Sequence, residues 1–235
     1  MKWLNVLTVV ILSFWTSATH GAGFDCKAAA TEVEKMICAD DALSAADYAL
    51  SHQYKVLLAV SSNDLTLKDS QRAWLNERNR CKEIKCLLTL YRGRREALQK
   101  HLDQLITKAP VVTSDEYFDS AEITAYPGKQ ILGIYHSCVK IKSAGPLAMV
   151  HFEVYFPDSG QILESEAPAV ISAQTGFSFN FVDGWYNQGK AKVTRNTNGL
   201  KLELDIAESA SAFSAKNIHR QYGEYSLVKK NCVRQ

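Results

Sequence analysis

Residues 71–86 read QRAWLNERNRCKEIKC. A tryptophan–leucine pair among charged residues is typical of an amphipathic helix, and the stretch ends on two cysteines, Cys81 and Cys86. Such thiols bind metal, carry out redox chemistry or form disulfides, and the cellular compartment decides between these uses. The fold of the first half of the chain therefore depends on what these cysteines do.

The chain opens MKWLNVLTVVILSFWTSATHGAGFDC, with one lysine before an apolar run from Trp3 to Trp15. This run is too short for a membrane span, which needs ~20 residues, and it has the layout of a secretory signal peptide over residues 1–22. Cys26 lacks a lipoprotein signal. We expect a soluble protein exported to the periplasm, with no stable membrane insertion after cleavage; the alternative is an uncleaved anchor.

Export favours disulfides for the six cysteines, none of which forms a C-x-x-C motif. His136 and Cys138 are a possible pair of metal ligands, but ordinary strand residues explain them better. We predict no metal and no cofactor. The 27 basic and 25 acidic residues nearly balance, so net charge gives no indication of nucleic-acid binding. Motifs of hydrolases and nucleotide-binding enzymes are absent from the sequence, so we predict no enzymatic activity.

Residues 24–108 follow a helical period. LSAADYALSHQYKVLL (43–58) and CLLTLYRGRREALQKHLDQLI (86–106) place apolar residues three and four apart. Thr31 with Glu34 forms a capping box, and Ser44 with Asp47 and Asp64 mark two further helix starts. The pattern predicts a bundle of roughly four helices.

After KAPVVTSDE (108–116) the apolar period changes to two. Alternation in HFEVYF, GFSFNFVDG, GKAKVTR and LKLELDI predicts antiparallel strands over residues 113–235, with a helical stretch at 209–219. The Asn198-Gly199 dipeptide suits a type I′ hairpin turn. We therefore predict an α+β fold, in which a disulfide-clamped helical bundle precedes a β-sandwich or small β-barrel.

The disulfide pairing follows from helix geometry. If Cys81 and Cys86 lay in one helix they would be about 7.5 Å apart along its axis, beyond the usual ~6.8 Å limit for a disulfide. Cys26 and Cys38 flank a helix and would lie farther apart still. We predict Cys38–Cys81 and Cys26–Cys86, with the reverse crossing as the alternative, and Cys138–Cys232 in the β half.

The spacing in FDC…TEVEKMIC, the L-x-x-x-D pattern around Asp47, QRAWLNERNRC and CL…YRGR resembles the LprI-like lysozyme-inhibitor family over about residues 24–102. Asn79 departs from the family's usual Asp, and Ala46 from a common Leu. The resemblance implies an exported protein, and for some members inhibition of lysozyme. The β half resembles no family that we recognise.

Asp47 and Arg78 both fall in this pattern, and we expect them to form a structural ion pair between helices. Trp74 is expected in the core. RNRCKEIK with YRGRR forms a basic cluster, which either faces solvent or meets an anionic lipid or acidic glycan. Because lysozymes are generally cationic, such a face would repel them.

The segment VDGWYNQGK (182–190) lies between two predicted strands, and its aromatic and amide side chains are typical of binding surfaces. We predict that Trp185, Tyr186, Asn187 and Gln188 contact a partner; alternatively, Trp185 folds back over the β structure. The leading hypothesis is a binding protein that inhibits lysozyme or another peptidoglycan hydrolase. Alternatives are an envelope immunity or scaffold protein, and a cell-wall hydrolase with an unrecognised site.

Overall fold

The computed structural model describes residues 22–61, 64–124, 131–156, 161–173, 175–206 and 221–232. The predicted signal peptide, apart from Ala22, lies outside the described residues. The helical stretch predicted at 209–219 also lies outside them.

Helices form the first half, as predicted: a short 3-10 helix η1 (Cys26–Ala28), then α1 (Glu32–Ala39), α2 (Asp41–Val60), α3 (Leu65–Arg78) and α4 (Ile84–Lys108). The Thr31–Glu34 capping box and the Asp64 cap are present. The predicted start at Ser44 is wrong, because Asp40 caps α2 by accepting from the Leu43 amide. None of the helices in the described part is both long and apolar enough to cross a membrane.

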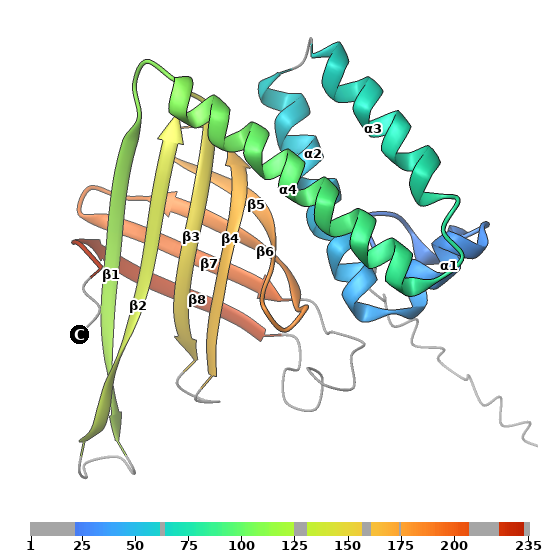
Figure 1. The fold of residues 1–235 in the computed structure, drawn as a ribbon. Coiled ribbons are helices and arrows are strands. Elements are labelled where there is room, and N and C mark those ends of the chain that lie inside the picture. The colour runs from blue at the N-terminus through green and yellow to red at the C-terminus, as the bar shows by residue number, and fades with distance from the viewer. Residues whose placement is uncertain are drawn as a thin grey trace, which may run out of the picture.

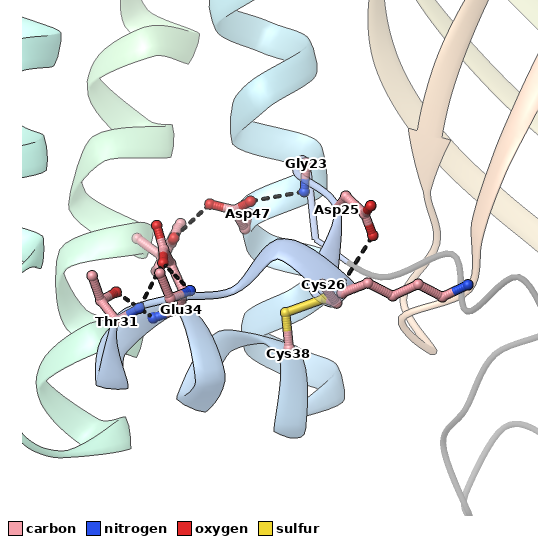
Figure 2. Close-up of a disulfide and its surroundings, with 10 residues drawn as sticks. Gly23, Asp25, Cys26, Thr31, Glu34, Cys38 and Asp47 are labelled. Atoms are coloured by element: carbon pink, nitrogen blue, oxygen red, sulfur yellow. Dashed lines mark hydrogen bonds between the residues drawn. A yellow bond between two sulfur atoms is a disulfide. The ribbon is translucent and has the colours of Figure 1, made fainter.

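A buried polar cluster ties the helices together. The Tyr91 hydroxyl donates to Asp47 Oδ1 at 2.6 Å, and Arg78 Nη1 lies 3.7 Å from the same oxygen, so the predicted ion pair is present. The Gly23 amide donates to Asp47 Oδ2 at 2.8 Å (Figure 2). Burial and the Asp47 charge raise the pKa of Tyr91, which therefore remains a donor. We call Asp47, Arg78 and Tyr91 the Asp47 cluster.

Trp74 packs beside this cluster, in the core as predicted. Its ring meets Tyr91 edge-on at 5.1 Å between centroids, and the Arg78 guanidinium lies 5.7 Å from its centroid. The indole N–H donates to the Leu90 carbonyl at 3.2 Å. Side chains from α2, α3 and α4 thus meet around one carboxylate.

The disulfides in the helical half correct our prediction. Cys26 bonds Cys38, as Figure 2 shows, and Cys81 bonds Cys86, instead of the predicted Cys38–Cys81 and Cys26–Cys86. The prediction excluded a Cys81–Cys86 bond on the condition that both lay in one helix, whereas α3 ends at Arg78 and α4 begins at Ile84. The intervening turn brings their Cα atoms to 5.7 Å. The segment before the short helix α1 likewise folds back, so that Cys26 and Cys38 lie 5.8 Å apart.

The second half is an antiparallel, nearly closed, barrel-like sheet. Its eight described strands are β1 (Thr113–Thr124), β2 (Ile131–Ala144), β3 (Leu147–Phe156), β4 (Gln161–Val170), β5 (Gly176–Val182), β6 (Gln188–Arg195), β7 (Gly199–Ile206) and β8 (Gln221–Lys229). The strand order is β4-β3-β2-β1-β8-β7-β6-β5. In Figure 1, β1 to β4 lie in front, β5 to β8 cross behind them, and the helices gather on one side.

The junction of β1 with β8 is short. Only Tyr117 with Lys229 and Phe118 with Val228 pair in the described register. Cys138 on β2 lies opposite Phe118 on β1. It bonds Cys232, which lies just beyond the end of β8, and this is the predicted pair. This disulfide reinforces a junction that few backbone hydrogen bonds hold.

Strands β4 and β5 end the strand order and leave a seam without a backbone ladder in the described part of the sheet. Ser165 Oγ on β4 bridges the seam by donating to the Val182 carbonyl at 2.8 Å. Helix α2 attaches to both sides of it. His52 Nε2 donates to the Pro168 carbonyl on β4 at 2.7 Å, and the Tyr48 hydroxyl donates to the Gly189 carbonyl on β6 at 3.3 Å.

The protonation of these two side chains suits their contacts. Burial lowers the pKa of His52, and burial together with the Asp205 charge raises the pKa of Tyr48 to about 12. Near neutral pH His52 is therefore uncharged, with its proton on Nε2, and Tyr48 keeps its hydroxyl proton.

Strand β3 packs against the helices with the face that points away from the interior of the sheet. Val150 and Phe152 point into the interior of the sheet, while Leu147 and Met149 join the core of the helical half. Both faces of its first residues are buried, which matches the uninterrupted apolar run LAMV. The two halves therefore share one packed interface.

The turn between β6 and β7 is not type I′. Such a turn requires positive φ at both central residues, and none of Asn196, Thr197 and Asn198 has it. Gly199 instead serves a close approach, since a Cβ there would lie 2.1 Å from the Leu227 carbonyl oxygen on β8.

We predict that Arg78→Met lowers the free energy of unfolding by about 3 kcal/mol, because it leaves the Asp47 carboxylate buried without its cation. Urea denaturation followed by circular dichroism measures the change. The control is Arg72→Met, which removes an exposed pair with Asp69 and should cost less than about 0.5 kcal/mol. Equal effects of the two substitutions would show that the cluster is not a stability centre.

Candidate functional site

The turn between β5 and β6, residues 183–187, is built around one carboxylate. Asp183 Oδ1 accepts from the backbone amides of Trp185 and Asn187, each at 2.8 Å, and Oδ2 accepts from Asn187 Nδ2 at 2.6 Å. Burial raises the pKa of Asp183, although these hydrogen bonds oppose the shift. The carboxylate fixes the turn from inside and is not available to a ligand.

Backbone hydrogen bonds complete this turn. The Tyr186 amide donates to the Asp183 carbonyl, and the Asp183 amide donates to the Asn187 carbonyl. Tyr186 has φ of 66°, a left-handed conformation that a tyrosine rarely adopts and that its surroundings must hold. The turn is therefore a rigid support for the side chains that it presents.

The four side chains predicted to contact a partner divide into two pairs. Trp185 is 68% exposed and Tyr186 49% exposed, so Trp185 does not fold back over the sheet. Asn187 and Gln188 are buried, with Asn187 fully enclosed, and the prediction that they present amides to a partner is wrong. Asn187 turns inward because its amide is a donor to Asp183.

A cleft of about 780 Å³ separates this turn from the helices. Tyr186 and Gly184 line one wall, and the others come from α2 and α4. Residues of the helical walls include Ala42, Ala46, Gln53, Leu88, Tyr91, Arg92, Arg95, Glu96 and Gln99. Both halves of the protein thus build the cleft, which lies where α2 crosses the seam of the sheet.

The predicted basic cluster separates into different roles. Arg94 donates to Gln71 Oε1 at 2.9 Å and to Ser70 Oγ at 3.1 Å, and so joins α4 to α3. Arg92 and Arg95 line the cleft instead. Their i, i+3 spacing places them on one face of α4. No sequence pattern indicates that the turn and these arginines lie across one cleft, because their proximity depends on tertiary packing.

Cys138 is not available as a metal ligand, because it is bonded to Cys232. The His136 ring stacks near Phe118, with 5.0 Å between centroids. The described residues contain no group of three or more His, Cys, Asp and Glu side chains arranged to hold a metal ion.

Comparison with known proteins finds a family match in the helical half. Residues 26–98 match the family model described as Lysozyme inhibitor LprI. Over these residues the helical half is similar to the LprI family. This agrees with the resemblance seen in the cysteine and tryptophan spacing, and the matched residues include the whole Asp47 cluster.

The chain is also similar to Lipoprotein LprI of Mycobacterium bovis and of two strains of Mycobacterium tuberculosis. Each is 31% identical over 123 residues, which is 48% of this chain and 60% of the relative. The match therefore spans less than two thirds of the length of these relatives. No solved structure matches the chain.

Both departures from the LprI pattern have structural consequences. The Asn79 side-chain oxygen accepts from Arg78 Nε at 3.1 Å and from Nη2 at 2.9 Å, so a neutral amide fills the place of the usual carboxylate. Ala46 lines the cleft, where the larger leucine would occupy part of the volume.

We predict that Asp183→Ala lowers the free energy of unfolding by about 3 kcal/mol, because buried donors of Asn187 lose their acceptor. Asp183→Asn should cost less than about 1 kcal/mol. The side-chain oxygen of the amide introduced at position 183 can accept from the two backbone amides. The NH₂ group of that amide can donate to Asn187 Oδ1, which has no partner in the unchanged protein, once the Asn187 amide has flipped. Urea denaturation of both variants checks this; equal losses would mean that charge, not hydrogen-bond matching, holds the turn.

Proposed function

We propose that this protein is an exported binding protein that inhibits lysozyme or a related peptidoglycan-cleaving enzyme by stoichiometric contact, without catalytic turnover. The match of the helical half to the family described as Lysozyme inhibitor LprI supports the class of partner. The observation that carries the contact site is Trp185, 68% exposed on a turn that a buried carboxylate holds in place.

An exposed indole on a rigid turn suits inhibition by surface contact. Tryptophan brings a large contact area, and a fixed backbone has little freedom left to lose when a partner binds. Tryptophan is also enriched among residues whose truncation costs most binding energy. Trp185 is not among the residues that line the cleft, so its ring is available to a partner outside it.

The turbidity of a cell-wall suspension distinguishes this proposal from its alternatives. An inhibitor preserves the turbidity when lysozyme is added, and titration gives an equivalence point at a fixed molar ratio. A cell-wall hydrolase would clear the suspension without added enzyme. An envelope immunity or scaffold protein would do neither. Lysozymes of the different structural classes should be tested separately, since the family description names no class.

We predict that Trp185→Ala weakens inhibition by about 2 kcal/mol, or roughly 30-fold, as truncation of an interface anchor does. The inhibition constant from the turbidity assay measures the effect. The matched control is Leu65→Ala on α3, which removes a side chain that is 70% exposed and should leave the constant unchanged.

Circular dichroism must show that the Trp185→Ala variant is folded, as the exposure of this side chain leads us to expect. A folded variant with undiminished inhibition would refute the assignment of the contact to the β5–β6 turn. The proposal of lysozyme inhibition would then depend on the turbidity assay of the unchanged protein alone.

Export to the periplasm is part of the proposal, and the N-terminal sequence pattern together with the three disulfides supports it. Intact-mass measurement on protein from the envelope fraction should show loss of residues 1–22, with all six cysteines oxidised. A mass that retains the N-terminal segment would indicate the uncleaved anchor instead.

A further inference from the structure

The cleft between the LprI-like helices and the β5–β6 turn has the size of a small-molecule site. Its volume of about 780 Å³ falls within the range of ligand pockets, roughly 300–1,000 Å³. Trp185, the proposed contact for a protein partner, is not part of its lining. The cleft is therefore distinct from the proposed contact at Trp185.

Two cations that line the cleft have no partner among the residues that the structure describes. Neither Arg92 nor Arg95 has a hydrogen bond or ion pair with any residue that the structure describes, whereas Arg94 between them is bound to α3. The surrounding protein lowers the pKa of the Arg95 guanidinium by partial desolvation, although its side chain is open to solvent. A guanidinium of this kind pairs readily with a carboxylate in two parallel hydrogen bonds.

The acidic groups of the cleft leave this positive charge in excess. The Asp183 carboxylate is occupied by the turn. Glu96, one turn after Arg92 on α4, is exposed and lines the same wall. A bound molecule would therefore meet two free cations and one free carboxylate, which favours an anionic group combined with hydrogen-bond donors.

A buried acceptor, Gln53 Oε1, also favours a ligand with hydrogen-bond donors. Gln53 is 8% exposed, and its Oε1 is buried without a hydrogen-bond partner, while its Nε2 donates to Gln99 at 3.2 Å. An unpaired buried carbonyl costs free energy that an O–H or N–H donor would recover. Gln53 and Gln99 both line the cleft, so a rotation of the Gln53 amide that brings Oε1 to the cleft surface would let a ligand there supply that donor.

Tyr186 faces the helices across the cleft on the rigid turn, half exposed. A tyrosine ring offers an apolar face with a polar tip, which suits a ring that is itself apolar on its faces and polar at its edges. We propose that the cleft binds a carboxylate-bearing sugar, with Arg92 and Arg95 on the carboxylate, Glu96 and Gln53 accepting from hydroxyl or amide groups, and Tyr186 against the sugar ring.

This site does not depend on lysozyme inhibition, because Trp185 does not line it and sugar binding needs no enzyme. A protein loop with an acidic side chain would also meet Arg92 and Arg95. It would not need an acceptor as deep as Gln53 Oε1, nor a flat aromatic wall, and we therefore favour the sugar.

The test is a titration of the purified full chain, followed by ¹H–¹⁵N NMR, with three probes: N-acetylmuramic acid, N-acetylglucosamine and lactate. The first two share the sugar ring and differ in the lactyl carboxylate, and lactate carries the carboxylate without the ring. N-acetylmuramic acid should bind at least tenfold more tightly than either of the others, with shifts at α4 and the β5–β6 turn. Equal binding of the two sugars, or of lactate and N-acetylmuramic acid, would overturn the proposal.

Two variants alter the cleft in independent ways. Joint replacement Arg92→Gln and Arg95→Gln should remove the tenfold preference for the acidic sugar, and Ala46→Leu should weaken its binding by occupying the cleft. The control Arg72→Gln, on the exposed face of α3, should bind as the unchanged protein does. Unchanged preference in the folded arginine variant would refute the site, whatever the turbidity assay shows; loss of inhibition alone in Trp185→Ala would leave it standing.

Discussion

The constraint on which this structure depends is the open seam between β4 and β5. A strand edge with unpaired backbone groups must be covered or it will pair with another chain. Here helix α2 covers it, through His52 on the Pro168 carbonyl and Tyr48 on the Gly189 carbonyl. The helical half therefore completes the edge of the sheet. Because α2 packs over the seam, the β5–β6 turn lies beside α2 and α4.

Other unusual features of the sheet follow from the same closure. Proline is tolerated at position 168 because its nitrogen and its carbonyl lie on the unpaired edge of β4. That edge faces α2, and no neighbouring strand there needs a backbone N–H donor. Strand β3 is apolar on both faces because one lines the interior of the sheet and the other receives the helices. At β1 and β8, where only two pairs of described residues meet, the Cys138–Cys232 bond supplies a further connection.

Local patterns predicted local structure well. The change of apolar period placed the helix-to-strand transition between Lys108 and Thr113, and the Thr31 and Asp64 caps and the buried Trp74 were also foreseen. The disulfides of the helical half were not, because the end of α3 at Arg78 is marked by neither glycine nor proline. In one continuous helix Cys81 and Cys86 would be too far apart to bond, and Cys26 and Cys38 were excluded because they flank another helix.

The errors at Asn187 and Gly199 share a physical cause. In each case a residue common in exposed turns serves a buried neighbour: the amide of Asn187 donates to a buried carboxylate, and Gly199 lets β7 approach the Leu227 carbonyl. Composition identifies such a segment as a turn, but the direction of its side chains is decided by partners that are distant in the sequence.

The composite cleft has a consequence for how the LprI-like domain is interpreted. The family match ends at residue 98, while the turn that carries Trp185 and Tyr186 belongs to the sheet. A helical domain alone would keep the Asp47 cluster and both arginines but would lose the wall opposite them. The residues that the family model covers thus supply the scaffold and the charge, and the sheet, which that model does not cover, supplies the aromatic surface. A partner or ligand would then bind at the junction of the two halves. There the packing of α2 over the β4–β5 seam places the arginine face of α4 opposite the aromatic β5–β6 turn.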